Sequence, residues 1–552
     1  MLKAWRGALA VTLIVILTAT PAQAVPTPRE AVASDGGCAA FVVGQPEEVV
    51  SDATRDRLGL DGWPDGPFGI TALGGGAYYF HIAAAFGGSD PSRPQRNVTV
   101  KGTLANPVRD GVAFSTQLRN VPAGYIWAGG GAVHRDPDTG VVLQTLHMER
   151  RISGDQFYAE LHLGRLDPAT GVTTYLGPVV QPDIPIGDAT WNADLGIPQL
   201  TVVRGGDGID YLHMYFADFR LADGRQVPAG LSVARAPVKD VIAAAQRGTV
   251  VAWHKYTGDG AWDQPAWGGS SADLNLGQSM AWGPQVVRSN AMDGYVMAAG
   301  VSAREIVLST SGNGLDGWSA RFPVARDPGY HNAYVTPVGN GPDPADLGMD
   351  FSLYYLQWPS PTPNWDNAHV MRRKVICADG LTPVRKPFTR YVKAGHHLVT
   401  TGTPPSGYTR EGNWTLWSAP QPGTRALYGC RAATDDYFIS VDPGCEGDQT
   451  TIVQTEGWIH TERPSNAYIP LYRCHIPGFG DHFVSADSGC EGNGVTNEGL
   501  LGFSPPAATY KSARHKVPLL ASPAVHLPAA SIPSPSRNSV TPGQRPYEAS
   551  VG

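Results

Sequence analysis

Three acidic residues stand in short phrases that also carry tryptophan, arginine or proline. They are Asp65 in GWPDGPFG, Glu149 in LHMERR and Asp194 in NADLGIPQ. Carboxyl groups that face one another across a pocket suit the hydrolysis of a glycosidic bond. One carboxyl must stay protonated to donate to the leaving oxygen, while another stays ionised to activate water. We therefore predict that Asp65, Glu149 and Asp194 are catalytic.

Aromatic and charged residues at comparable points of the chain could bind the substrate, since tryptophan faces hold sugar rings. This predicted set is Trp127, Arg150, Asp218, Arg220, Trp282, His331 and Trp358. A base at Asp65 should have Arg150 or Arg220 beside it, which favours the ionised form. The acid should be buried against Trp127 or Trp282, which raises its pKa.

Each acidic residue also has an interpretation that involves no chemistry. Asp65 and Asp194 lie in loops rich in Gly and Pro, where Asp often caps a turn. Glu149 is followed by Arg150 and Arg151 and could form surface ion pairs with them. The two interpretations differ in whether the three carboxylates meet.

The elements that must position these side chains are β-strands. The 66 glycines and 47 prolines are 113 of the 552 residues, whereas charged residues are 16% and aromatic residues 9%. Helices tolerate Gly and Pro poorly, and disordered chains carry more charge and fewer aromatic residues. An all-β fold with many turns remains.

A phrase made of an apolar strand, a DG or DxxTG turn and a second strand recurs along the first part of the chain. Four copies are AVHRDPDTGVVLQTLHMER, LTVVRGGDGIDYLHMYFADF, QVVRSNAMDGYVMAAGV and YVTPVGNGPDPADLGMDFSLYYLQW, and FGITALGGGAYYFHIAAAF is a degenerate first copy. Five such hairpins predict a five-bladed β-propeller over residues 33–380. The starts of its innermost strands and the ends of the next strands look into one central pocket. A helical stretch at Val238 to Gln246 is expected as an insertion in the third blade.

The fifth blade supplies only three strands, whereas AAFVVG near residue 40 is a strand without a blade. An N-terminal strand that completes the last blade would remove the exposed sheet edges of an open ring. It would also place Cys38 close to Cys377, so we predict a disulfide between them.

Residues 388–504 hold three copies of a shorter unit, which begin RYVKAGHHLVTT, ALYGCRAATDDYFISVDPGCEG and PLYRCHIPGFGDHFVSADSGCEG. Aligning the copies makes two sets of positions equivalent, His397, Tyr437 and His482, and Glu411, Glu456 and Glu498. The cysteine spacing predicts local disulfides Cys430 to Cys445 and Cys474 to Cys490. The unit is expected to be a small pseudo-threefold, trefoil-like β domain, in which the aligned His and Tyr residues either face a ligand or pack half-buried.

The first region resembles the five-bladed glycoside hydrolase superfamily of arabinanases, xylosidases and invertases. The resemblance rests on the five blades, on Asp65 and Asp194 at the first and third inner strands, and on Gly329 and His331 in the fifth blade. It implies an Asp base in the first blade, an Asp in the second that tunes a pKa, and a Glu acid in the third. It also implies that the fifth-blade His helps to hold an ion or water in the channel.

This chain departs from that pattern at two points. The second inner strand begins with Trp127 and has no carboxylate there, and the third offers Asp194 where a Glu is usual. Glu149, from the adjacent strand end, is the candidate for the missing acid. The triple repeat resembles a domain of unknown function appended to secreted bacterial enzymes, especially actinobacterial ones. That resemblance implies an accessory module that attaches to carbohydrate or cell wall.

The N-terminus is typical of a secretory signal peptide over residues 1–24. Lys3 and Arg6 precede an apolar run from Ala8 to Thr20, and AQA ends at Ala24. A retained N-terminal anchor is the alternative. All six cysteines follow this site, and an even number favours disulfides in an oxidising compartment. We expect a secreted, extracellular protein with a disordered tail over residues 505–552.

The formal net charge of −7 offers no basic face for nucleic acid. The expected partner is a polysaccharide or cell-wall glycan, with no membrane contact after signal cleavage. No cofactor or metal site is predicted beyond a structural ion or water in the channel. The first function is thus a glycan-active hydrolase. The alternatives are a non-catalytic propeller that binds polysaccharide or an extracellular partner, and a lyase or phosphorylase on the same scaffold.

Overall fold

The computed structural model describes residues 38, 40–85, 96–116, 118–154, 156–274, 282–301, 305–326, 329–341, 343–360, 364–378, 384–421, 423–447 and 449–506. The expected signal peptide and nearly all of the expected tail lie outside these residues. The described residues form one compact unit. Within the described ranges, no helix is both long and apolar enough to cross a membrane.

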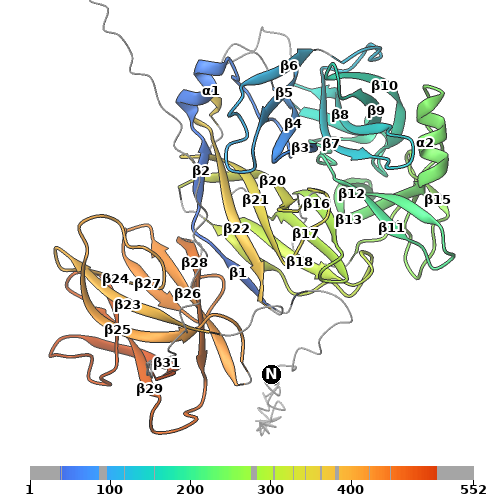
Figure 1. Ribbon diagram of the computed structural model, residues 1–552. Helices are drawn as coiled ribbons and strands as arrows, with labels where there is room; N and C mark the ends of the chain where they lie inside the picture. Colours follow the sequence, from blue (N-terminus) through green and yellow to red (C-terminus); the bar gives the residue numbers. More distant parts are fainter. Residues whose placement is uncertain are drawn as a thin grey trace, which may run out of the picture. The chain divides into compact units, whose positions relative to one another are not determined.

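Five antiparallel sheets follow one another in chain order, coloured from blue to yellow in Figure 1. Blade 1 contains β3 (Gly69–Gly74), β4 (Ala77–Ala84), β5 (Arg96–Gly102) and β6 (Val112–Thr116). Blade 2 contains β7 (Trp127–Arg135), β8 (Val142–Ser153), β9 (Gln156–Asp167) and β10 (Val172–Val180). Blade 3 contains β11 (Leu200–Arg204), β12 (Asp210–Ala222), β13 (Arg225–Pro237), β14 (His254–Lys255) and β15 (Gln264–Pro265). Blade 4 contains β16 (Trp282–Ser289), β17 (Gly294–Gly300), β18 (Glu305–Ser311) and β19 (Phe322–Arg326).

The fifth blade joins the two ends of the propeller sequence. Its strands β20 (His331–Gly339), β21 (Asp350–Trp358) and β22 (His369–Cys377) are completed by β1 (Phe41–Val43) and β2 (Glu47–Val50), which both pair with β22. Figure 1 shows the blue N-terminal strands beside the yellow β22. Cys38 and Cys377 form a disulfide with their Cα atoms 5.7 Å apart. The predicted five-bladed propeller and its ring closure are confirmed.

The helices are short. Helix α2 (Val238–Gln246) follows β13 in blade 3, as predicted. Helix α1 (Asp52–Leu58) was not predicted from the sequence, and short 3-10 turns lie at Ile186–Asp188 and Trp365–Asn367. The Ser51 side chain caps the first turn of α1, and Gly59 ends it at φ 62°.

Apolar side chains of neighbouring blades pack against each other around the ring. One cluster joins blades 2 and 3 through Leu161 and Phe216, and another joins blades 5 and 1 through Tyr354 and Phe80. The backbone N–H of Phe68 donates to the Thr336 hydroxyl at 2.9 Å, which links blade 1 to the inner strand of blade 5. These contacts hold the inner strand ends in fixed positions.

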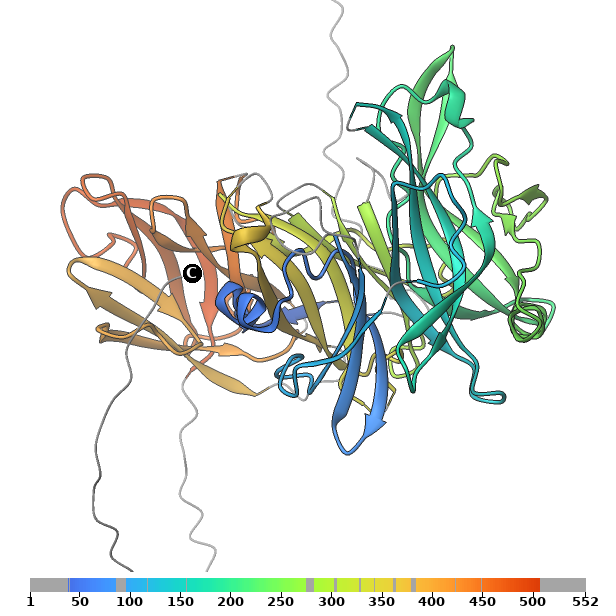
Figure 2. The same cartoon turned by 90° about the horizontal axis from the view of Figure 1, so that it is seen from above.

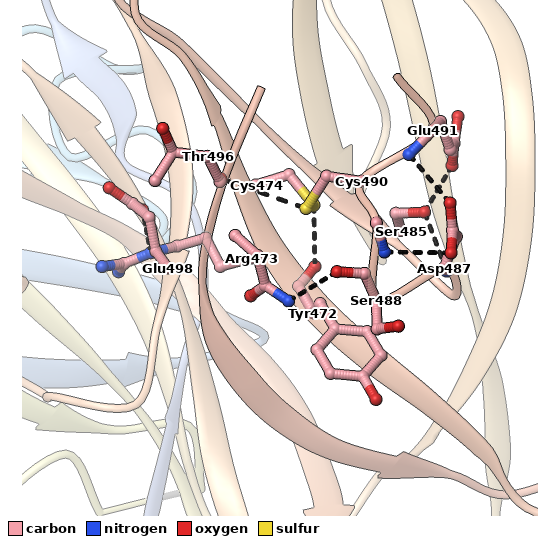
Figure 3. Close-up of a disulfide and its surroundings, with 12 residues drawn as sticks. Tyr472, Arg473, Cys474, Ser485, Asp487, Ser488, Cys490, Glu491, Thr496 and Glu498 are labelled. Carbon is pink, nitrogen blue, oxygen red and sulfur yellow. Dashed lines mark hydrogen bonds and ion pairs between the residues drawn. A yellow bond between two sulfur atoms is a disulfide. The ribbon is translucent and has the colours of Figure 1, made fainter. Parts of the chain in front are cut away.

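The repeats form a nine-stranded sheet, coloured orange to red in Figure 2. Each copy has three strands: β23 (Arg385–Lys393), β24 (His396–Thr400) and β25 (Thr409–Trp417), then β26 (Thr424–Ala432), β27 (Tyr437–Ser440) and β28 (Thr450–His460), then β29 (Ile469–Ile476), β30 (Asp481–Ser485) and β31 (Thr496–Ser504). The disulfides Cys430 to Cys445 and Cys474 to Cys490 are present, as predicted. Figure 3 shows the second of these within the third copy.

Candidate active site

Asp65 lies in the loop that leads into blade 1, where its backbone N–H donates to Ala83 O at 2.9 Å. Its carboxylate Oδ1 accepts a hydrogen bond from the Tyr334 hydroxyl at 2.8 Å. Tyr334 comes from β20 in blade 5, at an irregularity in the pairing with β21, and has φ 59°. A bulge of this kind changes the direction of a side chain, and here the hydroxyl meets the carboxylate of another blade.

His147 stands between the other two predicted carboxylates. Its Nε2 lies 3.3 Å from Glu149 Oε1, and its Nδ1 lies 3.9 Å from Asp194 Oδ1. Nδ1 is also 3.2 Å from the carbonyl oxygen of Gly196. A carbonyl oxygen only accepts, so Nδ1 carries a proton, and Nε2 faces an acceptor as well. The geometry therefore suits an imidazolium that donates from both ring nitrogens.

These five side chains, Asp65, His147, Glu149, Asp194 and Tyr334, form what we term the axial cluster. Burial raises the pKa of Asp65 to about 7; the Tyr334 hydrogen bond opposes this rise, and the charges of Glu149 and Asp194 add to it. Burial lowers the pKa of His147, but its bond to Glu149 and the charge of Asp194 outweigh burial and raise it to about 9. At neutral pH the cluster holds a cationic His147 and a carboxyl at Asp65 that is close to half-protonated.

Trp127 provides an aromatic wall beside the axial cluster. It begins β7 directly opposite Glu149, and its ring lies edge-on to the His147 ring with centroids 5.5 Å apart. The ring covers Gly129, where an added Cβ would be 1.9 Å from the indole. Glycine at this position is what allows the tryptophan to lie flat along the inner strand.

The structure places Arg150 away from Asp65. Its guanidinium donates to the Tyr125 hydroxyl at 3.0 Å and lies 3.4 Å from Glu160. Glu160 is almost fully buried, accepts from Tyr125 at 2.6 Å and contacts His162 at 3.3 Å. The expectation that Arg150 favours an ionised Asp65 is wrong, because the groups around Asp65 are a tyrosine, a histidine and two carboxylates.

Asp218 is not accessible to a substrate. Its side chain is 0% exposed and forms an ion pair of 2.7 Å with Lys255, which is equally buried. The Ser271 hydroxyl and the Asp183 backbone N–H also donate to it. The prediction that Asp218 binds substrate is therefore wrong, and its role is to pair a charge inside blade 3.

The remaining predicted residues have different surroundings. Trp358 is buried, and its ring packs edge-on against His331 with centroids 5.1 Å apart. This burial contradicts the prediction that Trp358 contacts substrate. His331 begins β20 and is half-buried, and Arg220 is exposed at the end of β12. The side chain of Trp282 lies outside the described residues.

The two interpretations of the acidic residues can now be compared. Glu149 contacts His147 rather than an arginine, which contradicts the surface ion-pair interpretation. Asp194 does form a turn, since its Oδ1 accepts from the Gly196 N–H at 2.9 Å, and it contacts His147 as well. The structure therefore brings Asp65, Glu149 and Asp194 into one electrostatically coupled group.

Two members of the axial cluster were missed from the sequence. His147 precedes Glu149 by two residues on the same strand, and side chains two apart share a face. That spacing in LHMER was an available signal. Tyr334 had no such signal in the sequence, because the direction of its side chain depends on the bulge in β20.

Comparisons with known proteins leave the family of this chain open. No protein-family profile matches the sequence, and no curated protein matches it. Among solved structures, the fold resembles the catalytic domain of a GH62 α-L-arabinofuranosidase from Coprinopsis cinerea, with 10% identity, a TM-score of 0.38, and 62% of this chain and 98% of that chain covered. An α-L-arabinofuranosidase from Lactobacillus brevis gives 14% identity, a TM-score of 0.35, and 56% and 89% coverage. A GH43_1 enzyme from Xanthomonas citri complexed with xylotriose gives 12% identity and a TM-score of 0.31, with 58% of this chain and 91% of that chain covered.

All three of these solved structures are glycoside hydrolases by name. With TM-scores below 0.5 and identities of 10 to 14%, these likenesses carry no inference about substrate or chemistry.

Proposed function

We propose that the propeller hydrolyses glycosidic bonds and that the axial cluster is its catalytic site. The observation that carries the proposal is the convergence of Asp65, Glu149 and Asp194 around His147. Glycoside hydrolysis needs two carboxyl groups with opposite protonation, and environments that push their pKa values apart identify the pair.

The environments favour Asp65 as the proton donor, which reverses the base role predicted for it from the sequence. Burial raises its pKa to about 7, so a protonated carboxyl is available near neutral pH. Tyr334 occupies Oδ1, which leaves the proton to Oδ2. Glu149, beside the cationic His147, is the carboxylate that takes a proton from the attacking water. The leaving oxygen receives the proton of Asp65, and the glycosidic C–O bond breaks as the C–O bond to water forms.

We assign substrate contacts to the partly exposed groups next to Glu149. Trp127 supplies an aromatic face, and Arg150 continues the surface from the end of β8. Beyond Arg150, the Trp267 ring is 38% exposed and packs against the buried His162. Aromatic faces and a guanidinium that is already positioned by Tyr125 suit the apolar faces and hydroxyl groups of a glycan.

We propose further that the protein acts outside the cell on a polysaccharide or cell-wall glycan, with the repeats as an accessory binding domain. Three disulfides support an oxidising compartment. The repeats pack on the propeller, since the buried Arg373 of β22 donates to the carbonyl oxygens of Ile452 and Val453 in β28.

The test compares wild type, Asp65→Asn and Asp110→Asn on a panel of aryl furanosides, aryl pyranosides and plant and bacterial polysaccharides. Asp110 is a matched control, because it carries the same charge in an exposed turn of blade 1 beside Arg109. The proposal is supported if wild type and Asp110→Asn turn over a substrate and Asp65→Asn loses turnover of the polysaccharides, with a smaller loss on activated aryl glycosides. A wild type that hydrolyses nothing yet binds a glycan as tightly as Asp65→Asn does would instead support a binding propeller.

A further inference from the structure

The third repeat places two histidines and a glutamate together on three neighbouring strands. His475 on β29 pairs directly across from His482 on β30, and Glu498 follows on β31. The two imidazole rings are stacked, with centroids 4.4 Å apart and 17° between their planes. One ligand atom from each of the three side chains lies within 4.8 Å of the other two.

We propose that His475, His482 and Glu498 bind a divalent transition-metal ion. Imidazole nitrogens with one carboxylate oxygen suit borderline ions such as Zn²⁺, Ni²⁺ and Co²⁺, whereas Ca²⁺ and Mg²⁺ prefer oxygen ligands alone. Both histidines are half-buried and Glu498 is more exposed, so an ion can reach the three groups from solvent. This site lies in the repeats and does not depend on the proposed hydrolysis in the propeller.

An outer layer of groups fixes the ligands in a suitable form. His482 Nδ1 lies 2.5 Å from Asp436 Oδ2, and the His482 backbone N–H donates to the same carboxylate at 3.0 Å. A carboxylate that accepts from Nδ1 leaves Nε2 as the nitrogen available to a metal, and such pairs raise ligand basicity. Nε2 is the atom that faces Glu498 Oε2, at 3.3 Å.

Arg473 holds the glutamate from the other side. Its Nε donates to Glu498 Oε2 at 2.7 Å, and its guanidinium also pairs with Glu446. Figure 3 shows Arg473 and Glu498 pointing toward each other near the Cys474 to Cys490 disulfide. A carboxylate has about four acceptor positions, so Glu498 can keep this bond and still bind an ion.

The charge of the surroundings favours a cation. Three carboxylates and one guanidinium surround His482: Glu446 and Glu498 pair with Arg473, and Asp436 pairs with His482 itself. With neutral histidines the group therefore carries two negative charges, which a divalent ion would neutralise.

The distances require one small adjustment. Metal-to-ligand bonds of about 2.0 to 2.1 Å place tetrahedral ligand atoms ~3.3 Å apart. The His482 to Glu498 distance of 3.3 Å already matches. The stacked His475 ring must rotate so that a nitrogen joins them. The rotation moves only the end of one side chain, because the strand pairing already places the two histidines opposite each other.

The first repeat provides a natural comparison. His397 there pairs with Asp481 and Glu411 as His482 pairs with Asp436 and Glu498. The residue across from His397 is Val392, however, where the third repeat has His475. His397 thus has the same kind of carboxylate partners as His482 but no imidazole across the strand pair, and the neighbouring His396 is exposed and lies 3.8 Å from Asp481. We expect this position to bind no ion.

The experiment titrates the full-length, tag-free protein with Zn²⁺ by calorimetry after removal of metals with a chelator, and follows Co²⁺ binding by its visible absorption. Wild type should bind one ion per chain. His475→Val gives the third repeat the valine that the first repeat has. Loss of a residue that only hydrogen-bonds a metal ligand lowers metal affinity by roughly 10 to 100-fold, and we expect His475→Val and Glu498→Gln, which remove ligands, to lower it further. Val392→His should create a second site and raise the stoichiometry to two.

His254→Asn is the matched control, since His254 is an exposed histidine of blade 3. It should leave the affinity and the stoichiometry unchanged. Thermal melting of each variant shows whether its fold is retained. The proposal is overturned if wild type shows no saturable binding of Zn²⁺ or Co²⁺. It is also overturned if folded His475→Val and Glu498→Gln proteins bind one ion as tightly as wild type.

Discussion

Asp65→Asn should make the protein more stable at alkaline pH while it lowers activity. The folded protein holds the Asp65 proton more tightly than the unfolded chain, because the pKa rises from 3.8 to about 7 on folding. Ionisation of Asp65 therefore lowers the free energy of unfolding as pH rises from about 4 to about 7, after which its contribution is constant. The difference between 3.8 and about 7, at about 1.4 kcal/mol per pH unit, gives an upper limit of about 4 kcal/mol.

Asparagine cannot ionise, yet its side-chain oxygen can still accept from Tyr334. In urea unfolding, the variant and wild type should thus be similar at pH 4 and should separate by up to about 4 kcal/mol at pH 8. Turnover of substrates with poor leaving groups should fall by about 10² to 10⁴-fold, and turnover of activated aryl glycosides should fall less. Equal stability of the two proteins at pH 8 would refute the assigned environment of Asp65, and an undiminished rate would refute its role as donor.

Three further changes test neighbouring parts of the argument. Tyr334→Phe removes a bond that lowers the pKa of Asp65, so the alkaline limb of the pH–rate profile should move up by about 1 to 2 units; an unmoved limb would separate Asp65 from the proton transfer. Lys255→Met leaves the buried Asp218 carboxylate without its partner and should lower the free energy of unfolding in urea by about 3 to 5 kcal/mol. A loss below about 1 kcal/mol would mean that water reaches the Asp218 carboxylate. Replacing both Cys38 and Cys377 by Ala opens a loop of 339 residues and should cost up to about 5 kcal/mol, measured by the urea midpoint; an unchanged midpoint would show that the strand pairing alone closes the ring.

The fold could be predicted because its signals are local. Each blade begins with a hairpin whose turn residues and apolar strands are adjacent in sequence, and the extra N-terminal strand has one available edge to join. Helix α1 was missed because seven residues are too few to show a helical period. It depends on the cap from Ser51 and on Gly59, which only the folded chain reveals.

The candidate site was predictable in its carboxylates and not in their surroundings. The prediction for Asp218 requires a strand that ends near this residue, but β12 continues for four more residues, to Ala222, and the carboxylate is buried. Tyr334 depends on a bulge, and a bulge changes which face each later side chain occupies. The alternation of apolar and polar residues along a strand cannot show where that change occurs. The groups that set the pKa of Asp65 could therefore not be predicted from the sequence.

In the repeats, too, the sequence did not predict the surroundings of the aligned residues. Alignment made Glu411, Glu456 and Glu498 equivalent, yet Glu456 is buried and accepts bonds from Thr400 and Thr401 of the first copy. It fits because the second copy has Gly429 where the others have arginine; an added Cβ there would be 2.5 Å from the Glu456 carboxylate. Loss of one arginine thus turns an exposed ion pair into a buried link between copies. Equivalent positions in a repeat therefore share a backbone but not a chemistry, and a ligand site in one copy predicts nothing about the other two until the facing residue is known.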